Sequence, residues 1–338
     1  MPKPGEYWFL KSPAYFPFMY KETANKDRFI VKALSQIAAD RGIEFSSLSH
    51  DWILQLRYKG LTHSIYGFYF DLNPAAAATI ANDKSALASI LDQRKIPHVE
   101  HVLFLAPRLS NYLGSDGNWS RAIQYAESVG YPLVCKTNQG TRGDSVFKIE
   151  NQTELEAAFQ HIHTSARGLA LSPFYSIDAE YRIILLRNDV LLCYHKEQLY
   201  VTGNGHSTFF ELIQSFSREM IEAALEEPCF QLEEVPAKGL KVPLVWKHNL
   251  SKGAIPQFNI NKKTRQKIVK LARETCSAIG MQFAAVDVIE TKGELRVIEV
   301  NSGICLEHLS QFSDEGRTLA FNVYASAVDS IFNLQDKG

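Results

Sequence analysis

The chain of 338 residues exceeds the roughly 100–150 residues of a typical domain, so two or three lobes are expected. Hydrophobic residues make up 46% and charged residues 22% of the sequence, which excludes a disordered chain, a collagen-like repeat and a coiled coil. The 36 Lys and Arg residues nearly balance the 37 Asp and Glu residues, so any anionic ligand must be held by a local cluster.

Cysteine usage and hydropathy bear on the compartment. The five cysteines are scattered and form no Cys-x-x-Cys pair, which argues against a disulfide framework and a zinc site: Cys135, Cys193, Cys229, Cys276 and Cys305. No apolar stretch approaches the ~20 residues that span a bilayer, and the first residues lack the apolar core of a signal peptide. These features predict a soluble, cytoplasmic protein without a nucleic-acid or membrane partner.

Residues 1–74 predict a small N-terminal α/β lobe. Apolar residues recur at helical spacing over residues 23–40, and Gly42 follows where a helix would end. Residues 43–73 alternate in polarity and are rich in β-branched and aromatic side chains. This pattern predicts short strands with a hairpin turn at Lys59-Gly60.

Residues 75–168 predict two linker helices and then a second lobe. The helices open at Pro74 and Asp83. The second lobe is expected to hold three strands and two helices, the last capped by Thr153: strands at 101–106, 131–136 and 146–150, and helices at 118–129 and 153–166. The order of strand, glycine-rich loop, strand and helix differs from that of a P-loop, which enters a helix directly.

Residues 169–338 predict a third lobe. It is expected to contain three strands, two helices and a long hairpin: strands at 169–175, 181–188 and 190–198, helices at 209–216 and 262–279, and a hairpin at 283–301. Residues 219–243 resemble an insertion with little regular pattern.

The long hairpin carries a candidate metal site. Glu299 and Asn301 are two residues apart on one strand and therefore share a face, and Asp287 on the paired strand can join them across the ladder. A charged side chain on an otherwise apolar strand is costly unless it is paired or binds a metal. Three oxygen ligands suit Mg²⁺, which completes its shell with phosphate oxygens and water. The alternative is a structural salt bridge at Glu299.

A second candidate site lies in the glycine-rich loop Gln139–Ser145. Its glycines, Gly140 and Gly143, allow backbone N–H groups to approach phosphate oxygens, and Lys136 at the end of the preceding strand supplies positive charge. The alternative for this loop is a simple β-hairpin turn. Lys84 is a further candidate for a phosphate contact, with a solvated helix lysine as its alternative.

A third candidate lies at the start of the strand at 181–188. Glu180 is placed to accept the two hydroxyl groups of a ribose, and the backbone around Ser172, Phe174 and Tyr175 is placed to meet an adenine edge. Arg182 would face a phosphate or a developing acyl phosphate. The alternative is an exposed strand edge with an ordinary Glu and Arg.

Six segments, taken in order, resemble the ATP-grasp superfamily, and within it the carboxylate–amine ligase branch that includes cyanophycin synthetase and the ligase domain of bifunctional glutathione synthetase. They are residues 83–97, 132–149, 171–186, 201–213, 249–255 and 287–303. The resemblance covers about residues 75–312, and its specificity lies in the order and spacing of the segments.

The resemblance implies an α+β fold of three lobes with ATP held between two of them, and ADP-forming synthesis of an amide through an acyl phosphate. It implies ATP and Mg²⁺ as cofactors, with two ions and with Mn²⁺ as a substitute. Residues matched to nucleotide contacts are Lys84, Lys136, Gly140, Thr141, Arg142, Gly143, Ser145 and Glu180. Residues matched to the metal are Asp287, Glu299 and Asn301, and those matched to phosphate transfer and catalysis are Arg182, Lys196 and Asn249.

The sequence departs from the family pattern near the expected substrate region. Gly303-Ile304-Cys305 replaces a segment that usually contains proline, and Gly253-Ala254 replaces a glycine pair. We expect small-molecule carboxylate and amine substrates, an amino acid or a short peptide, and the sequence leaves homo-oligomerisation open. Two alternatives also stay open: an inactive ATP-binding module that acts as a sensor or assembly partner, and a ligase that uses a thiol as nucleophile. Cys305 is expected to be a small buried apolar residue.

Overall fold

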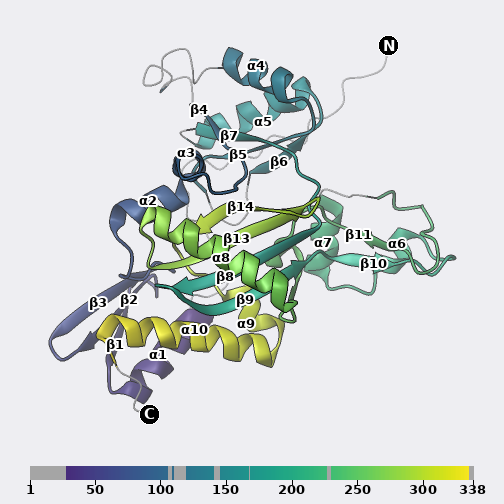
Figure 1. Cartoon of the computed structure of the whole chain (residues 1–338). Coiled ribbons are helices and arrows are strands. Elements are labelled where there is room, and N and C mark those ends of the chain that lie inside the picture. The colour runs from purple at the N-terminus through teal and green to yellow at the C-terminus, as the bar shows by residue number, and fades with distance from the viewer. Residues whose placement is uncertain are drawn as a thin grey trace.

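The computed structural model of the chain (Figure 1) describes residues 28–105, 109, 119–140, 145–166, 168–226 and 230–334. In these residues helices pack on four antiparallel sheets, so the α+β class expected from the sequence is confirmed. Three larger units and one small projecting unit are each built around a cluster of buried apolar side chains.

The N-terminal lobe consists of one helix on a three-stranded sheet: α1 (Phe29–Arg41), β1 (Glu44–Leu48), β2 (Ile53–Tyr58) and β3 (Leu61–Tyr66). The predicted turn is confirmed, because β2 and β3 pair as a hairpin around Lys59 and Gly60, both at positive φ. The helix ends at Gly42, as predicted, but begins at Phe29. The earlier part of the predicted helix lies outside the described residues.

Two short helices follow, α2 (Ala75–Asn82) and α3 (Lys84–Gln93), as the sequence predicts. Asp83 caps α3 by accepting a hydrogen bond from the backbone N–H of Ala86 at 2.9 Å. The apolar faces of both helices pack into the core that lies beneath helix α8 (Lys262–Ile279) of the C-terminal lobe.

The middle lobe lies at the top of Figure 1 and contains β4 (Val102–Leu105), α4 (Trp119–Val129), β5 (Leu133–Thr137), β6 (Val146–Ile149), α5 (Gln152–Ser165) and β7 (Gly168–Pro173). Its sheet has the order β4-β7-β5-β6, so the strand expected at 169–175 belongs to this lobe and its assignment to the third lobe is wrong. The predicted cap of α5 is wrong: Asn151 is the N-cap and accepts from the backbone N–H of Glu154 at 3.0 Å. Thr153 already lies inside the first turn, where its side chain cannot act as the cap.

The C-terminal lobe is a five-stranded sheet of order β12-β9-β8-β13-β14 with three helices. Its elements are β8 (Ala179–Leu186), β9 (Asp189–Glu197), β12 (Ile255–Gln257), α8 (Lys262–Ile279), β13 (Phe283–Thr291), β14 (Glu294–Asn301), α9 (Glu307–Phe312) and α10 (Asp314–Phe332). Helix α8 covers one face of the sheet together with α2 and α3. Helices α1, α9 and α10 cover part of the opposite face (Figure 1).

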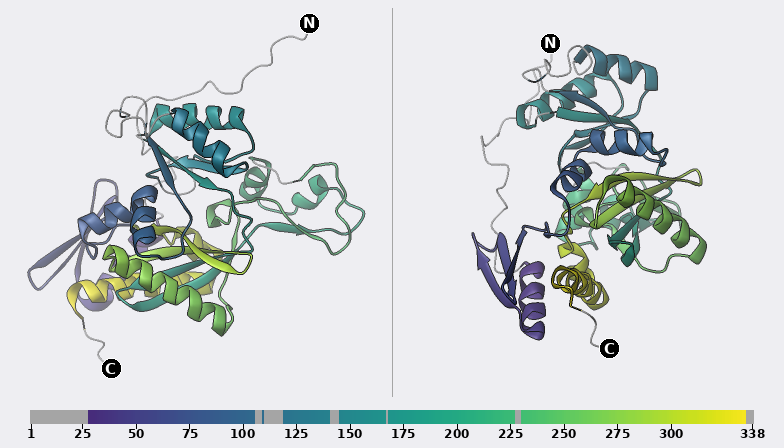
Figure 2. Two further views of the ribbon diagram at one scale, coloured as in Figure 1. Left: turned by 45° about the horizontal axis from the view of Figure 1, so that its top comes forward. Right: turned by 60° about the vertical axis from the view of Figure 1, so that its left-hand side comes forward.

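An arm formed by residues 199–245 projects from this lobe (Figure 2). It holds β10 (Tyr200–Thr202), α6 (Phe209–Ile213), α7 (Arg218–Glu226) and β11 (Lys241–Pro243), and the short helix η4 (Leu250–Lys252) follows it. Residues 219–243, whose sequence has little regular pattern, contain most of α7 and all of β11, whereas 230–240 form neither helix nor strand. Helix α7 forms because Met220, Ile221 and Ala224 pack into the small core of the arm itself.

Candidate active site

Arg182, Lys196 and Asp287 lie on one face of the C-terminal sheet. In the same strands, residues an even number of positions away, such as Ile184 and Ala285, belong to the apolar core shared with α1 and α10. Because successive side chains of a strand alternate between faces, the three charged residues continue that face beyond the core. One half of the face is therefore apolar and the other half is charged.

Asp287 is the centre of the charged half and is only 1% exposed. Its Oδ1 accepts from Arg182 Nε at 2.8 Å and its Oδ2 accepts from Arg182 Nη2 at 2.6 Å. Lys196 Nζ lies 3.1 Å from Asp287 Oδ1 and 2.5 Å from Glu180 Oε1. Burial acts to raise the pKa of Asp287, but the charges of Arg182 and Lys196 outweigh it and hold that pKa below its ordinary value.

The structure brings Asp287, Glu299 and Asn301 together. Asp287 is the direct cross-strand partner of Glu299, and a β-bulge follows Asp287 in the pairing of β13 with β14. Asn301 Nδ2 donates to Glu299 Oε1 at 3.0 Å, as expected for side chains that share a face. In the described part of the chain no cation forms an ion pair with Glu299, which does not favour the salt-bridge alternative.

The donor set of these three side chains fits a magnesium ion. Glu299 lies directly across the ladder from Asp287, so two carboxylates share this site and a cation would offset their repulsion. The carboxylate oxygens and the amide oxygen of Asn301 have lone pairs with which to accept a further ligand. Over the described ranges no group of three His, Cys, Asp or Glu side chains could hold a metal, and the present set differs from such a group because its third donor is an amide.

Lys84 and Lys136 approach this cluster from outside the sheet. Lys84 is the first residue of α3 and is 8% exposed, so it is not a solvated helix lysine. Lys136 lies on β5 of the middle lobe and is 6% exposed. Burial, together with the nearby charge of Lys84, lowers the pKa of Lys136 to about 8, while Glu299 and Glu180 act in the opposite direction. The two lysines and the carboxylates therefore form one electrostatic cluster.

The described start of the glycine-rich loop packs against Lys84. Lys84 Nζ donates to the carbonyl of Gly140 at 3.2 Å. A Cβ at Gly140 would lie 2.4 Å from Thr137 Oγ1, so only glycine allows this close approach. The loop also joins antiparallel β5 and β6, as the hairpin alternative requires. Ser145, at φ 54°, ends the loop, and Thr141, Arg142 and Gly143 lie outside the described residues.

Asn138, which sequence reasoning did not assign to the site, and Gln139, the first residue of the candidate loop, tie the start of the loop to Asp83. Asn138 Nδ2 donates to Asp83 Oδ1 at 2.9 Å, and Gln139 Nε2 donates to Asp83 Oδ2 at 3.0 Å. The helix cap at Asp83 is the only sequence feature that marks this contact. It ties the N-terminus of α3, and with it Lys84, to the end of β5.

The predicted nucleotide hinge lies at the end of β7. Ser172 is 2% exposed, and the Phe174 ring lies 5.8 Å from the ring of Trp246, a residue that sequence analysis did not identify. The Tyr175 ring lies under the guanidinium of Arg296 at 5.5 Å. Glu180 is 9% exposed and paired with Lys196, so the alternative of an exposed strand edge is wrong.

Asn249 lies in the loop that follows the arm. Its side-chain oxygen accepts from the backbone N–H of Ser251 at 3.1 Å and caps η4. The neighbouring His248 bonds the backbone carbonyl of Lys196 through Nδ1 at 2.9 Å, which brings this loop beside β9. Because His248 is bonded to Lys196, the next residue, Asn249, lies near the charge cluster.

His101 is a further member of the cluster that sequence analysis missed. It is 6% exposed, and its Nε2 has no hydrogen-bond partner among the described residues. Burial and the charges of Lys136 and Lys84 lower its pKa well below the ordinary value, so the ring is neutral at pH 7. A polar residue at the start of an apolar strand was the available signal.

The structure corrects one expectation about the cysteines. Within the described residues Cys135, Cys193, Cys276 and Cys305 form no disulfide bond, and Cys229 lies outside those residues. Cys305, which was expected to be buried, is exposed. It follows Ile304, which turns into the core while Cys305 turns outward.

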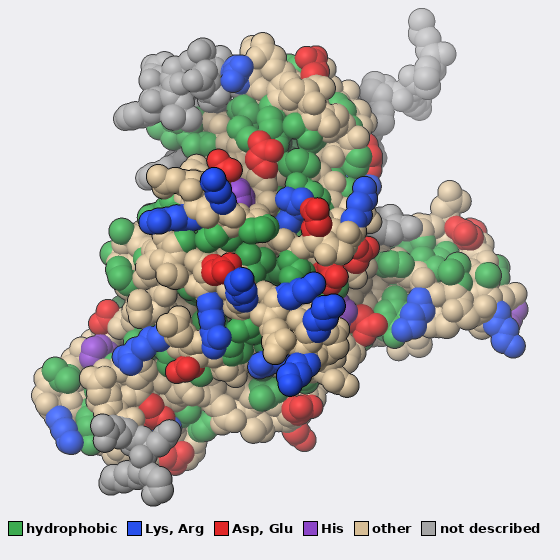
Figure 3. Space-filling model, in the orientation of Figure 1, with side chains coloured by type: hydrophobic (Ala, Val, Ile, Leu, Met, Phe, Trp, Pro, Cys, Tyr) green, Lys and Arg blue, Asp and Glu red, His purple; other side chains and the backbone are tan. Residues whose placement is uncertain are grey.

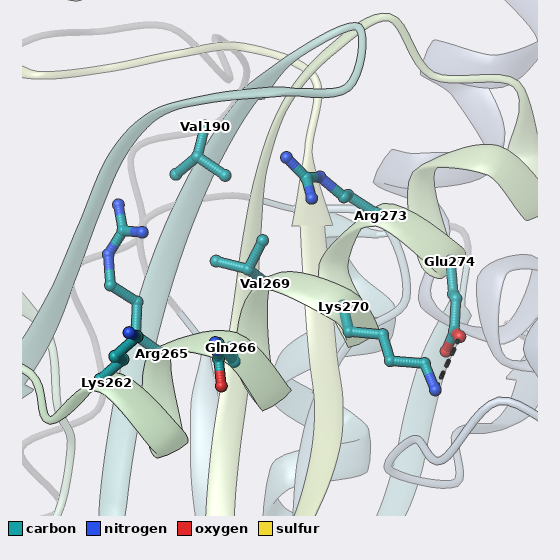
Figure 4. A pocket seen from close by; sticks show the side chains of 8 residues that line it. All are labelled: Val190, Lys262, Arg265, Gln266, Val269, Lys270, Arg273 and Glu274. Carbon is teal, nitrogen blue, oxygen red and sulfur yellow. Dashed lines mark ion pairs between the residues drawn. The ribbon is translucent and has the colours of Figure 1, made fainter.

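A separate hollow of about 580 Å³ lies between α8 and the start of β9 (Figure 4). It is lined by Val190, Lys262, Arg265, Gln266, Val269, Lys270, Arg273 and Glu274. Lysine and arginine side chains gather over this helix in Figure 3. Because α8 packs on the sheet face opposite Asp287, this hollow is distinct from the charge cluster.

No family model matches the chain. The sequence is 26% identical over 282 residues to cyanophycin synthetase from Trichormus variabilis, covering 77% of this chain and 30% of that protein. It is 24% identical over 325 residues to cyanophycin synthetase from Geminocystis herdmanii, covering 87% of this chain and 35% of that protein. The chain therefore spans about a third of the length of these curated relatives. Within the described residues, no helix is long and apolar enough to cross a membrane.

Solved structures with a similar fold include a bifunctional glutathione synthetase from Pasteurella multocida, with a TM-score of 0.54 at 16% identity over 91% of this chain and 45% of that one. D-alanine–D-alanine ligase from Bacillus anthracis gives a TM-score of 0.53 at 12% identity over 79% of this chain and 72% of that one. Identities this low establish the fold alone. The sequence relatives and the fold agree with the resemblance of the six segments to ATP-grasp ligases.

Proposed function

We propose that the chain is an ATP- and Mg²⁺-dependent ligase that joins a carboxylic acid to an amine as an amide or peptide bond. The observation that carries the proposal is the charge cluster in which buried Lys84 and Lys136 lie close to half-buried Glu299, and Lys136 also lies close to Glu180. Cations that suit phosphate oxygens stand beside oxygen ligands that suit Mg²⁺. The names of the similar proteins favour an amino acid or short peptide as substrate.

Nucleotide binding is assigned to residues of helix α3, of the middle lobe and of the C-terminal lobe. Lys84 and Lys136 hold the phosphates as point charges, and the backbone of the glycine-rich loop approaches the same oxygens. Glu180 accepts the ribose hydroxyls, for which its pairing with Lys196 fixes the orientation of the carboxylate. The backbone beside Phe174 and Tyr175 meets the adenine edge.

Asp287, Glu299 and Asn301 are assigned to the metal, with two ions bound and with Mn²⁺ as a substitute for Mg²⁺. When bound, the metal offsets negative charge on the phosphates as a Lewis acid. Arg182 and Lys196 fix the carboxylate of Asp287 from two sides, so it is oriented before the ligand arrives.

The chain's own residues account for the rest of the chemistry. A substrate carboxylate oxygen attacks the γ-phosphorus, an acyl phosphate forms and ADP leaves; the amine then attacks the acyl carbon, and phosphate leaves with formation of the C–N bond. Arg182, Lys136 and Lys84 supply positive charge where negative charge spreads in the first step. Asn249 lines the transfer region. Neither step needs a covalent enzyme intermediate.

The test is release of ADP and phosphate in the presence of pooled amino acids and dipeptides, with mass spectrometry of the products. A product mass equal to the sum of two substrates minus water supports the ligase. Substitution Glu299→Gln should lower turnover by at least about 100-fold, because it removes a charged ligand next to the transferred group. Glu294→Gln, at the exposed end of the same strand, is the matched control and should retain full activity. Full activity in Glu299→Gln would refute the metal assignment.

The alternative of an ATP-binding module without ligase activity has one specific observation in its favour. The segment Gly303-Ile304-Cys305 departs from the family pattern next to Asn301. Tight ATP binding in calorimetry, with no turnover across the pools, would support this alternative. A product whose mass and reactivity indicate a thioester would instead identify a thiol nucleophile.

A further inference from the structure

A loop of the N-terminal lobe reaches the end of the strand that carries Glu299 and Asn301. Tyr69, which follows β3, forms an antiparallel bridge with Gly303, and the backbone N–H of Ile304 donates to the carbonyl of Phe68 at 3.0 Å. Tyr69 is thereby held beside Gly303, which follows Asn301 by two positions in the chain. The N-terminal lobe thus contributes a side chain next to the proposed metal site.

The Tyr69 ring lies directly over the α-carbon of Gly303. A Cβ added at Gly303 would lie 3.1–3.3 Å from three atoms of that ring. Such contacts are tighter than ordinary packing, so the missing side chain at 303 makes room for the ring. Tyr69 is nevertheless 37% exposed, which leaves the rest of the ring open to a ligand.

The hydroxyl group of Tyr69 is held by a short polar network. Asn82 hydrogen-bonds to Tyr69, and its Oδ1 accepts from Ser302 Oγ at 3.1 Å. The hydrogen bond of Asn82 acts to lower the pKa of Tyr69, as expected when the amide N–H donates to the phenolic oxygen. The phenolic proton is therefore not used by Asn82. Burial raises the pKa of Tyr69, so the hydroxyl stays protonated at neutral pH.

This network links Tyr69 to the strand that carries the proposed metal ligands and to the helix that carries Lys84. Asn82 ends α2 and lies two residues before Lys84, whereas Ser302 follows Asn301 directly. A ligand that contacts Tyr69 would thus be adjacent to the proposed metal strand and to the helix that carries Lys84.

We propose that Tyr69 is a substrate-contacting residue: its ring forms one wall of the organic-substrate site, and its hydroxyl donates a hydrogen bond to a carbonyl or carboxylate oxygen of the carboxylic acid or amine substrate. The inference rests on the proposed ligase function. It assigns selection of an organic substrate, and not of ATP, to a residue of the N-terminal lobe.

The experiment compares Tyr69→Phe and Tyr69→Ala with the unaltered chain, using the two organic substrates that the pooled assay identifies. Tyr69→Phe removes one hydrogen bond and should raise KM for one organic substrate about 2–10-fold. Tyr69→Ala also removes the wall and should raise that KM further. The Kd of ATP in calorimetry should change less than about twofold, because Tyr69 contacts none of the residues assigned to nucleotide binding.

Two further variants separate a contact from a structural effect. Tyr66→Phe alters the last residue of β3, a tyrosine that is 52% exposed and packs on Trp52, and it should leave every constant unchanged. Gly303→Ala pushes the Tyr69 ring away while keeping its hydroxyl and should raise the same KM. Unchanged KM for both organic substrates in Tyr69→Phe and Tyr69→Ala would overturn this inference alone, and so would an equal loss of ATP affinity. Absence of ligation by the unaltered chain would overturn the proposed function and this inference together.

Discussion

The two faces of the C-terminal sheet carry charge in opposite ways. On one face Glu180, Arg182, Lys196 and Asp287 are mostly buried and joined by ion pairs of 2.5–3.1 Å. On the other, helix α8 exposes a row of cations: Lys262, Lys263, Arg265, Lys267, Lys270 and Arg273. The described contacts of that row include one ion pair, Lys270 with Glu274 at 3.8 Å.

The difference shows that burial, and not the number of charges, marks the candidate site. A buried charge costs several kcal/mol unless partners offset the lost hydration, so each such residue in the cluster requires its neighbours. A solvated charge on α8 is screened by water and salt and needs none. The exposed cations on α8, although more numerous, therefore say less about the location of the candidate site than the buried charge cluster does.

The sharpest test of this contrast is Asp287→Asn. The substitution leaves Arg182 and Lys196 without their buried carboxylate, so we expect the free energy of unfolding to fall by about 3–5 kcal/mol. Glu274→Gln on α8 is the matched control and should change it by less than about 0.5 kcal/mol. Urea denaturation followed by circular dichroism measures both. A loss below about 1 kcal/mol in Asp287→Asn would refute the contrast.

The second test uses the lowered pKa of Lys136, which is about 8. As pH rises through this value, the lysine of the free chain loses its charge, so nucleotide affinity is highest below pH 8 and falls above it. Lys84, whose pKa is also lowered by burial, acts in the same direction. Between pH 7 and 9 the Kd of a non-hydrolysable ATP analogue should rise about tenfold, which corresponds to about 1.4 kcal/mol.

Two variants check that Lys136 is responsible. Lys136→Arg keeps its charge over this range, so its pH dependence should be flatter. Lys270→Ala, on the exposed face, should follow the unaltered chain. A pH dependence that is unchanged in Lys136→Arg would assign the titration to another group.

The smallest effect is expected for a carboxylate whose burial is intermediate between that of the charge cluster and that of the α8 cations. Half-buried Glu307 accepts hydrogen bonds from the backbone N–H groups of Phe29 at 2.7 Å and Ile30 at 3.2 Å, and so caps α1 from a remote segment. Glu307→Ala should cost about 1 kcal/mol in urea denaturation. Exposed Glu315→Ala should cost less than about 0.5 kcal/mol, and equal losses in the two variants would refute the capping role.

Regular elements with a strong periodic pattern could be predicted from the sequence. Helix α8 has the predicted bounds, 262–279, and the hairpin of β13 and β14 lies within the predicted 283–301. Helix α7 was missed, because its apolar residues find a partner only in the small core of the arm. The cap of α5 was misplaced by two residues, since neighbouring Asn and Thr residues both suit that position.

The sequence by itself determined the chemical types in the candidate site: Asp287, Glu299 and Asn301 stand out because strand alternation fixes which residues share a face. Only the tertiary structure decided their partners. The pairing of Arg182 and Lys196 with Asp287 depends on the register of β8, β9 and β13. The places of Lys136, His101 and Tyr69 depend on how separate lobes pack, and local sequence patterns carry no information about contacts between segments so far apart in the chain.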